Sequence, residues 1–234
     1  MTDSQAHEHH ITVERSARYV TLGPRDGTAR EIWFVLHGYG QLAADFIQRF
    51  ASLDDGTRAI VAPEALNRFY LVGVEAAPAT ERPVGATWMT KEDRLGEIND
   101  YVSYLDAVAA RELQPYEKRA TQPRIVVLGF SQGAATASRW IVSGAIRPAH
   151  IVLWGGFLPP DVDPSSAPLS ATSFQIVHGS RDRFLSVERL AEEERRLREH
   201  GFRYRLVRYE GGHGIVPATL GEVARSLGVE PPNE

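Results

Sequence analysis

The sequence predicts a single α/β domain, in which a mostly parallel central sheet carries helices on both faces. Two observations predict this class. Several short apolar runs are nearly continuous, as is typical of strands that are buried on both faces of a sheet. Amphipathic helical patterns lie between these runs, and no repeat or low-complexity linker divides the 234 residues. We therefore expect one domain over residues 1–234, with about residues 1–10 as a flexible N-terminal tail.

The strands are expected in the following order along the chain. Two short β-rich stretches, at 11–13 and 18–22, indicate an antiparallel start to the sheet. The buried strands that follow are expected at residues 31–36, 59–62, 125–130, 151–154 and 174–177. Residues 203–209 alternate between polar and apolar side chains, which favours a more exposed strand near an edge of the sheet.

Four segments have the periodicity of helices. The first repeats apolar residues at helical spacing, and the third is a charged segment whose apolar face is formed by Leu190 and Leu197. The helices are expected at residues 95–113, 132–143, 187–200 and 219–227. Residues 63–89, by contrast, are rich in Pro and Ala and have no clear period. Loops of that length in compact domains are usually functional or disordered, and we expect this one to wall a pocket.

Composition excludes several classes of protein. A net charge of −4 offers no basic surface for nucleic acid. No apolar run is long enough to cross a bilayer, and the N-terminus has no apolar segment of a secretory signal. With no Cys, the chain has no disulfide, thiolate nucleophile or zinc–thiolate site. His7, His9 and His10 lack a matching carboxylate cluster, so we expect no metal and no other cofactor. These features favour a cytoplasmic enzyme.

The strongest motif is Gly129-Phe130-Ser131-Gln132-Gly133, which has the pattern G-x-S-x-G. This pattern places a serine on a sharp strand-to-helix turn at the carboxyl edge of the sheet, where the glycines avoid collisions with neighbouring elements. The pattern alone occurs by chance, but here it lies between a predicted buried strand and a predicted helix. We therefore predict the α/β-hydrolase fold, with Ser131 as the nucleophile.

Two backbone N–H groups are expected to stabilise the negative charge that develops on the substrate oxygen. The first belongs to Gln132, at the start of the helix that follows the serine, where backbone N–H groups lack helical partners. The second comes from the loop after the predicted strand 31–36, which reads His37-Gly38-Tyr39-Gly40. Tyr39 is the candidate donor in this loop. His37 precedes the nucleophile in the sequence, so we expect it to brace the loop rather than act as the base.

The order of catalytic residues in this fold, serine, then acid, then histidine, selects the base. His213 follows the last predicted strand within Gly211-Gly212-His213-Gly214. Among the histidines downstream of Ser131, only this one lies in a glycine-rich loop, which lets the imidazole reach the nucleophile. We therefore predict His213 as the base, the alternative being a turn histidine held by contacts with its own backbone.

The orienting acid has more than one candidate. Asp182 follows the predicted strand 174–177, at the sheet edge where α/β sites are built, and it is the predicted acid. Asp161 and Asp163 are competitors, because some α/β hydrolases place the acid after the preceding strand. The alternative for Asp182 is a plain surface ion pair with the neighbouring Arg181 or Arg183.

Together these motifs resemble those of the phospholipase/carboxylesterase family, which includes acyl-protein thioesterases. The resemblance covers residues from about 35 to 227 and adds His178-Gly179-Ser180-Arg181-Asp182 to the motifs above. It implies Ser131, Asp182 and His213 as a catalytic triad, with Tyr39 and Gln132 as backbone oxyanion donors. It also implies a metal-free enzyme without a large cap domain, and a homodimer is the state of many members.

Six residues are candidates for the substrate pocket. Trp88 resembles the tryptophan that family members carry near the acyl pocket, and Phe157-Leu158-Pro159 resembles the family's apolar stretch after the strand that follows the nucleophile helix. The remaining candidates are apolar residues near the expected site. The full set is Trp88, Phe69, Tyr70, Phe157, Leu158 and Leu185.

Departures from the family pattern bear on the substrate. Gln41 stands where members often have an acidic residue, Met89-Thr90 replaces an aromatic residue and Asp, and residues 67–84 differ from the thioesterase branch. We therefore expect an esterase that cleaves small or medium acyl esters through an acyl-enzyme, without a nucleic-acid partner or stable membrane insertion. The alternatives are a thioesterase or lysophospholipase with the same triad and, from another class, a protein that binds a ligand without hydrolysing it.

Overall fold

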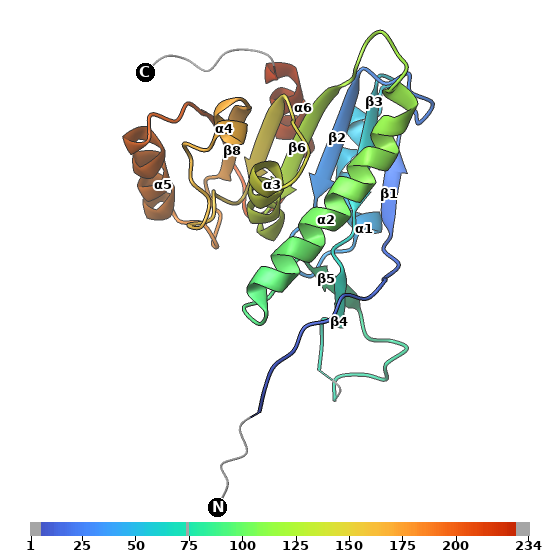
Figure 1. Cartoon of the computed structure of the whole chain (residues 1–234). Helices are drawn as coiled ribbons and strands as arrows, with labels where there is room; N and C mark the ends of the chain where they lie inside the picture. Colours follow the sequence, from blue (N-terminus) through green and yellow to red (C-terminus); the bar gives the residue numbers. More distant parts are fainter. Residues whose placement is uncertain (1–5, 74, 228–234) are drawn as a thin grey trace, which may run out of the picture.

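A seven-stranded sheet runs through the centre of the protein (Figure 1). The structure is a computed structural model that describes residues 6–73 and 75–227. The strand order is β1-β3-β2-β6-β7-β8-β9. All neighbouring strands are parallel except β1, which pairs antiparallel with β3 at one edge. The predicted mostly parallel sheet, with an antiparallel start, is confirmed.

The sheet strands are β1 (Tyr19–Leu22), β2 (Glu31–Leu36), β3 (Arg58–Pro63), β6 (Arg124–Phe130), β7 (His150–Trp154), β8 (Ser173–Gly179) and β9 (Arg205–Tyr209). A separate antiparallel hairpin is formed by β4 (Asn67–Tyr70) and β5 (Val84–Thr87). The α-helices are α1 (Ala43–Ile47), α2 (Arg94–Leu113), α3 (Gln132–Ser143), α4 (Ala167–Ser170), α5 (Val187–Glu199) and α6 (Pro217–Ser226). Short 3₁₀ helices follow α1 and α2, at Gln48–Leu53 and Gln114–Tyr116.

Helices cover both faces of the sheet because alternate strand side chains enter two separate cores. In β2, Ile32 and Phe34 belong to the core beneath α2, α3 and α5, whereas Trp33 and Val35 belong to the core beneath α1 and α6. All six residues of β2 are buried. The near-continuous apolar run of this strand therefore has the cause expected from the sequence, burial on both faces. Figure 1 shows α2 crossing one face, with α1 and α6 behind the sheet.

Most predicted elements are confirmed, and the edge position of β9 is confirmed as well. The expected strand at residues 11–13 is wrong. Ile11 and Val13 are 86% and 71% exposed, and residues 11–13 are irregular and pair with no strand of the sheet. Residues 6–10 of the predicted tail are exposed and irregular, while residues 1–5 lie outside the described residues.

The prediction of one long loop at residues 63–89 is wrong in one respect, because this segment contains the β4–β5 hairpin. The root of the hairpin joins the loop after β2. Gly40 N–H donates to Ala86 O (2.8 Å), and Ala86 N–H donates to Gln41 O (3.2 Å). Gly85 lies so close that a Cβ there would be 2.4 Å from Gly40 O. The hairpin escaped prediction because its strands are four residues long and β5 is half Gly and Ala.

Two kinds of feature are absent from the described residues. None of the helices in residues 6–73 and 75–227 has the length and apolar character needed to cross a bilayer. Within the same residues, no three His, Asp or Glu side chains gather in a way that could hold a metal ion.

Three histidines are buried within or next to the sheet. His37 follows β2, His150 begins β7 and His178 lies near the end of β8. Burial lowers the pKa of each of these imidazoles, because a charged ring loses its hydration there. Among the described residues, the Nδ1 atoms of His150 and His178 have no hydrogen-bond partner.

We expect the free energy of unfolding to decrease as the pH falls from about 7.5 to about 5.5. The unfolded chain titrates its histidines near pH 6.5, whereas their folded pKa values are lower. The unfolded state therefore binds more protons in this window, and stability is lost as the pH falls through it. Urea unfolding at the two pH values measures the change.

A histidine variant tests whether the buried histidines cause this loss of stability at lower pH. Burial raises the pKa of Glu193, which acts in the opposite direction but is a single group against three. Replacing one histidine, by His150→Gln, should make the decrease smaller. Equal stability at both pH values in the unmodified protein, or the same decrease in the variant, would contradict the assignment.

Candidate active site

The turn between β6 and α3 carries Ser131 in a strained conformation. Its φ of 55° and ψ of −116° lie outside the regions that residues with a Cβ normally adopt. Ser131 N–H donates to Trp154 O (2.9 Å), which ties the turn to the end of β7. The serine thus stands at the carboxyl edge of the sheet, as the G-x-S-x-G motif predicts.

The two motif glycines are required by the close approach of backbone on both sides of the turn. A Cβ on Gly129 would lie 2.2 Å from Gly133 O. A Cβ on Gly133 would lie 2.2 Å from Leu36 O, at the end of β2. No side chain fits at either position, so the turn can bring Ser131 to the surface only with glycine there.

A cleft of about 600 Å³ opens next to this turn. Its volume is in the range of small-molecule sites. Ser131, Tyr39 and His213 line it, together with three of the predicted pocket residues. The lining residues are Gly38, Tyr39, Gln41, Phe130, Ser131, Ala135, Gly155, Gly156, Phe157, Leu158, Pro159, Pro160, Phe184, Leu185, Arg189 and His213.

The other three predicted pocket residues are not part of the cleft lining. Trp88 is 1% exposed, and its indole Nε1–H donates to His37 O (2.8 Å). Phe69 stacks on Tyr39 at 5.0 Å between ring centroids, and Tyr70 is 46% exposed with the Arg82 guanidinium over its ring. Trp88 therefore packs in the core, Phe69 packs against a residue of the cleft lining, and Tyr70 is exposed on the hairpin.

Asp182 and His213 come from adjacent loops and are hydrogen-bonded. His213 Nδ1 lies 2.7 Å from Asp182 Oδ2. The other carboxylate oxygen, Oδ1, accepts the backbone N–H groups of Phe184 (2.9 Å) and Leu185 (3.1 Å). The carboxylate side chain is fully buried. With Nδ1 donating to the carboxylate, the imidazole keeps Nε2 free as a proton acceptor.

The competing acids are engaged elsewhere. Asp161 binds Arg139 through both carboxylate oxygens (2.9 and 2.8 Å) and also binds Arg94 (2.7 Å), and these hydrogen bonds hold its pKa well below the usual range. Asp163 accepts from the backbone and hydroxyl of Ser165. Among the described residues, the ion-pair partner of Asp182 is His213, not a neighbouring arginine.

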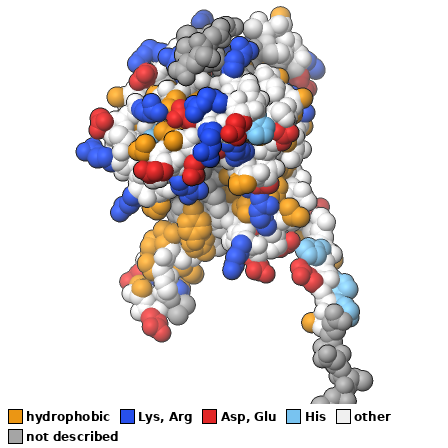
Figure 2. All heavy atoms as spheres, turned by 90° about the vertical axis from the view of Figure 1, so that its left-hand side faces the viewer, with side chains coloured by type: hydrophobic (Ala, Val, Ile, Leu, Met, Phe, Trp, Pro, Cys, Tyr) orange, Lys and Arg blue, Asp and Glu red, His pale blue; other side chains and the backbone are white. Residues whose placement is uncertain are grey.

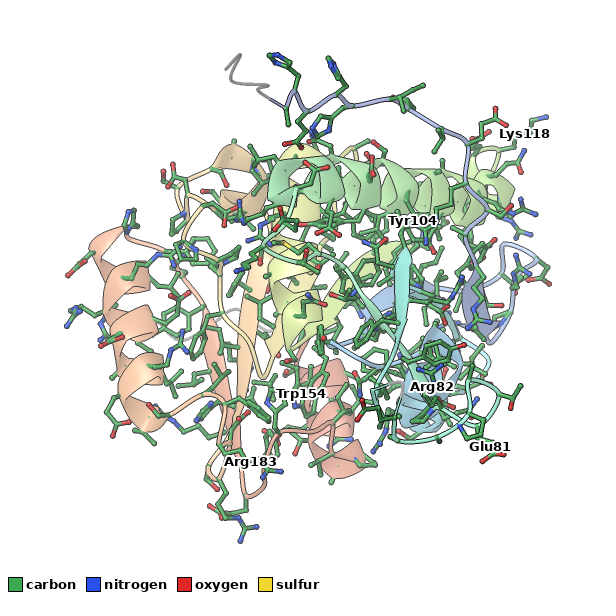
Figure 3. The ribbon with its side chains drawn as sticks, turned by 90° about the horizontal axis from the view of Figure 1, so that it is seen from below. Glu81, Arg82, Tyr104, Lys118, Trp154 and Arg183 are labelled. Atoms are coloured by element: carbon green, nitrogen blue, oxygen red, sulfur yellow. The ribbon has the colours of Figure 1, made fainter. Side chains whose placement is uncertain are left out.

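The loop that carries His213 is held from two sides. The Tyr209 hydroxyl lies 2.7 Å from both Gly212 O and Gly214 O, and Trp154 Nε1–H donates to Gly214 O (3.0 Å). The imidazole itself packs against Phe130 and Phe184, at 4.9 and 4.7 Å between ring centroids. Figure 3 views the molecule from below, with Trp154 inside it and Arg183 pointing outward.

One backbone N–H of the loop after β2 is left free. Gly38 N–H donates to Gln41 Oε1 (2.8 Å), Gly40 N–H to Ala86 O (2.8 Å) and Gln41 N–H to Gly38 O (3.3 Å). Within the described part of the chain, no acceptor is found for the N–H of Tyr39 or of Gln132. Both predicted oxyanion donors are thus available for a ligand.

His37 cannot serve as a base in this arrangement. Its Nδ1 donates to Gly38 O (2.8 Å), and its Nε2 accepts the N–H of Ala65 (3.0 Å). The ring is completely buried and stacks on Trp88 at 5.1 Å between centroids. Both nitrogens are used to hold the loop, in keeping with the bracing role expected from the sequence.

The side chain of Gln132 has a structural role that the sequence analysis missed. Its Oε1 accepts the N–H of Trp88 (3.1 Å), and its Nε2 donates to Thr87 Oγ1 (2.9 Å) and Met89 O (2.8 Å). The amide thereby fastens the end of β5 to the nucleophile turn.

The sequence analysis also missed three residues of the cleft lining, Gln41, Phe184 and Arg189. Their position just after strand ends, or in the first turn of the next helix, is the signal that could have indicated them.

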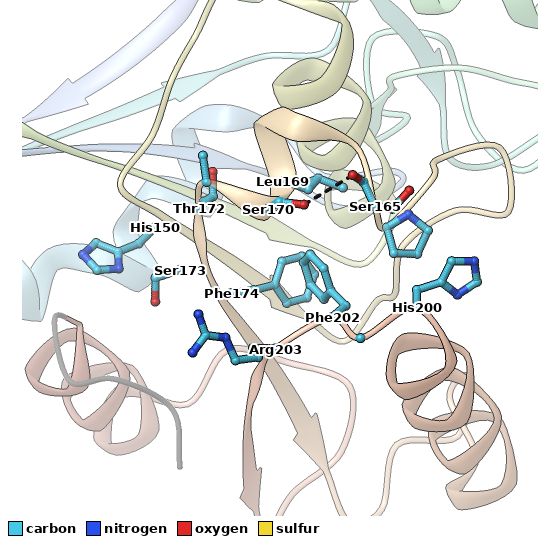
Figure 4. A pocket seen from close by; sticks show the side chains of 13 residues that line it. His150, Ser165, Leu169, Ser170, Thr172, Ser173, Phe174, His200, Phe202 and Arg203 are labelled. Carbon is cyan, nitrogen blue, oxygen red and sulfur yellow. Dashed lines mark hydrogen bonds between the residues drawn. The ribbon is translucent and has the colours of Figure 1, made fainter. Parts of the chain in front are cut away.

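A second pocket, of about 490 Å³, lies at the opposite edge of the sheet, where β7 and β8 begin (Figure 4). His150, Ser173, Phe174 and Phe202 are among its lining residues. None of Ser131, Asp182 and His213 lines it. Ser131 and His213 line the cleft at the carboxyl edge instead.

The model of the phospholipase/carboxylesterase family matches residues 24–229, nearly the whole chain. The chain belongs to the phospholipase/carboxylesterase family. Membership makes it an ester hydrolase of the carboxylesterase and thioesterase type. The comparison with curated proteins gives no match.

Solved structures of similar fold include other members of this class. The chain is similar to acyl-protein thioesterase 2 of Zea mays, with 20% identity, a TM-score of 0.64 and coverage of 91% of this chain and 98% of the other. The carboxylesterase of Mesorhizobium loti has 19% identity, a TM-score of 0.63 and coverage of 89% and 94%. The phospholipase/carboxylesterase of Dyadobacter fermentans has 21% identity, a TM-score of 0.61 and coverage of 92% and 98%. At these identities the likeness concerns the fold.

We expect Gly133→Ala to lower the free energy of unfolding by about 2–4 kcal/mol, because the added Cβ must displace the backbone of β2. Gly73→Ala is the matched control. A Cβ there would meet no atom within 4 Å, so the change should stay within about 0.5 kcal/mol. Urea unfolding of both variants measures the difference, and similar stability of the two would contradict the packing argument.

Proposed function

We propose that the protein is a serine carboxylesterase that hydrolyses short- to medium-chain carboxylic esters through an acyl-enzyme. The observation that carries the proposal is the 2.7 Å hydrogen bond between Asp182 and His213, at the cleft that Ser131 also lines. A buried carboxylate that orients a histidine, in a cleft shared with a half-buried serine in a strained turn, is the arrangement that activates a hydroxyl for attack on a carbonyl.

The mechanism uses groups of the chain itself. His213 Nε2 takes the proton of Ser131 as Oγ attacks the acyl carbonyl, and the Tyr39 and Gln132 N–H groups stabilise the oxyanion. His213 then gives the proton to the leaving alcohol. In the second half, water loses a proton to His213 as it attacks the acyl-enzyme, and His213 returns this proton to Ser131 Oγ as the bond to the acyl group breaks and the acid leaves. Asp182 keeps its charge throughout and stabilises the imidazolium.

The lining of the cleft supports a substrate of limited size. Phe157, Leu158 and Leu185 offer apolar contacts, and Pro159 and Pro160 belong to the lining as well. A volume of about 600 Å³ admits a small ester together with a short acyl chain. These dimensions favour small and medium esters over the long acyl chains of lysolipids.

Two other functions are compatible with the family. A thioesterase would use the same groups, and the similarity of fold to a thioesterase keeps this alternative open. A ligand-binding protein without turnover would have no need for the Asp182–His213 pair or for a serine in a strained turn. The cost of holding Ser131 at positive φ therefore favours an enzyme.

We expect Ser131→Ala to abolish the hydrolysis of 4-nitrophenyl butyrate, so that kcat falls by at least about 10³-fold. The release of 4-nitrophenol measures it. A fluorophosphonate probe should label the unmodified protein at Ser131 and leave the variant unlabelled.

The Asp182→Asn variant should also lose most of the esterase activity, because the imidazole of His213 is no longer held in the required tautomer. Full activity of Ser131→Ala would refute the site.

Among 4-nitrophenyl esters, we expect those with acyl chains of about two to eight carbons to have the highest kcat/KM, because the cleft volume is about 600 Å³. A panel from acetate to palmitate measures the preference. The same panel includes a butyryl thioester and a lysophospholipid. A higher kcat/KM for the lysophospholipid, or for the thioester after correction for its intrinsic reactivity, would replace the esterase assignment with that alternative.

A further inference from the structure

The cleft lining contains one permanently charged side chain among its described residues, the guanidinium of Arg189. No Asp or Glu side chain belongs to the lining, and the buried carboxylate of Asp182 lies behind His213. On the molecular face that carries α5, basic and acidic side chains are intermixed, and hydrophobic side chains gather below them (Figure 2). The cleft differs from that face in having positive charge only.

Arg189 makes no ion pair with any described residue. Glu192, three residues further along α5, forms no ion pair with a described residue, and Glu193 and Asp161 have other partners. Glu193, one turn along α5, binds Arg196 (3.2 Å) and accepts the N–H of Leu158 (3.2 Å). Asp161, in the stretch beyond Pro159 and Pro160, is held by Arg139. The guanidinium is therefore free to bind an anion in the cleft.

The position of Arg189 within α5 is unfavourable for the helix. Ser186 is the N-cap, and its side chain accepts the N–H of Arg189 (3.3 Å). The third helical residue after such a serine is typically Glu or Gln, whose side chain reaches back to the N-cap N–H and completes a capping box. A cation in the first turn also faces the positive end of the helix dipole. Departures of this kind from local preference are expected at functional sites.

We propose that Arg189 binds a carboxylate of the substrate, so that the preferred substrates are esters carrying a negative charge at a distance from the scissile bond. This rests on the proposed esterase function of the same cleft. A guanidinium can hold a carboxylate through two parallel hydrogen bonds. Leu158, Pro159 and Leu185 line the same cleft and can contact the apolar part of such a substrate, while the exposed guanidinium meets its carboxylate.

The test compares charged and neutral esters of equal shape. On the acyl side, the mono-4-nitrophenyl esters of adipate and suberate are paired with the corresponding carboxamides. On the alcohol side, the butyryl ester of 4-hydroxybenzoate is paired with that of 4-hydroxybenzamide. The ratio of kcat/KM within each pair, compared between variants, cancels the intrinsic reactivity of the esters.

We expect the unmodified protein to favour the charged member of at least one pair, and Arg189→Gln to lower that ratio by about tenfold, which corresponds to roughly 1.4 kcal/mol. The preference should decrease with added salt. Arg183→Gln is the matched control, because it removes the same charge from the loop before α5 but does not belong to the cleft lining. Its ratio should equal that of the unmodified protein.

Two further measurements keep the outcome decisive. Glu or Gln at position 189 suits the capping box, so the Tm of Arg189→Gln should be equal to or above that of the unmodified protein, which excludes misfolding as the cause. Calorimetry with adipate and adipamide, on Ser131→Ala and on Ser131→Ala combined with Arg189→Gln, measures anion binding without catalysis. Adipate should bind only when Arg189 is present.

The failure of this proposal is distinct from failure of the esterase function. No charge preference in either pair, or a preference that survives Arg189→Gln, overturns the anion subsite and leaves ester hydrolysis standing. Absence of all ester hydrolysis overturns the proposed function. In that case the calorimetry still decides the subsite, since equal binding of adipate with and without Arg189 refutes it.

Discussion

The site depends on the close packing of backbone around the turn between β6 and α3. Gly133 lies against the end of β2 and Gly129 lies against Gly133, with no space for a side chain at either position. This contact forces Ser131 into a conformation that residues with a Cβ seldom adopt. It also brings the loop after β2, with its free Tyr39 N–H, next to the nucleophile. A core that buries both faces of the sheet supplies the energy that keeps this strained turn in place.

The sheet topology explains why residues far apart in the sequence meet. Strands β6, β7, β8 and β9 are parallel neighbours, so the loops that follow them open at the same edge. The loops after β6, β8 and β9 carry Ser131, Asp182 and His213 in turn. Tyr209 and Trp154 then hold the histidine loop, so that its glycines permit the bend without leaving the ring loose. The geometry is therefore a property of strand order as much as of the motifs.

The sequence predicted the parts that have strong local signals. The buried strands, α3 and the edge position of β9 follow from apolar runs, helical spacing and alternation, and the structure agrees with them. Residues 11–13 were misjudged because apolar residues alone do not supply a pairing partner. The β4–β5 hairpin was missed because its stability comes from contacts with Gly40 and Gln41, which no local pattern reveals.

At the predicted site, too, sequence order indicated some residues correctly, whereas contacts between distant residues could not be predicted. The hydrogen bond of Asp182 to His213 connects two residues that chain order had selected. Whether Asp161 was available could not be judged from sequence, because its partners Arg94 and Arg139 lie far away in the chain. Trp88 resembles a pocket residue by its motif, yet its indole packs on His37. A buried aromatic residue and a pocket aromatic residue have the same sequence signal.

The amide of Gln132 joins the hairpin to the catalytic turn through contacts with Thr87, Trp88 and Met89 at its base. The connection between β4 and β5, beyond those contacts, takes no part in this anchorage. The reacting groups and the base of the hairpin are thus fixed together, whereas the connection is not held by these bonds. The connection can therefore differ in length and chemistry while the reacting groups keep their positions.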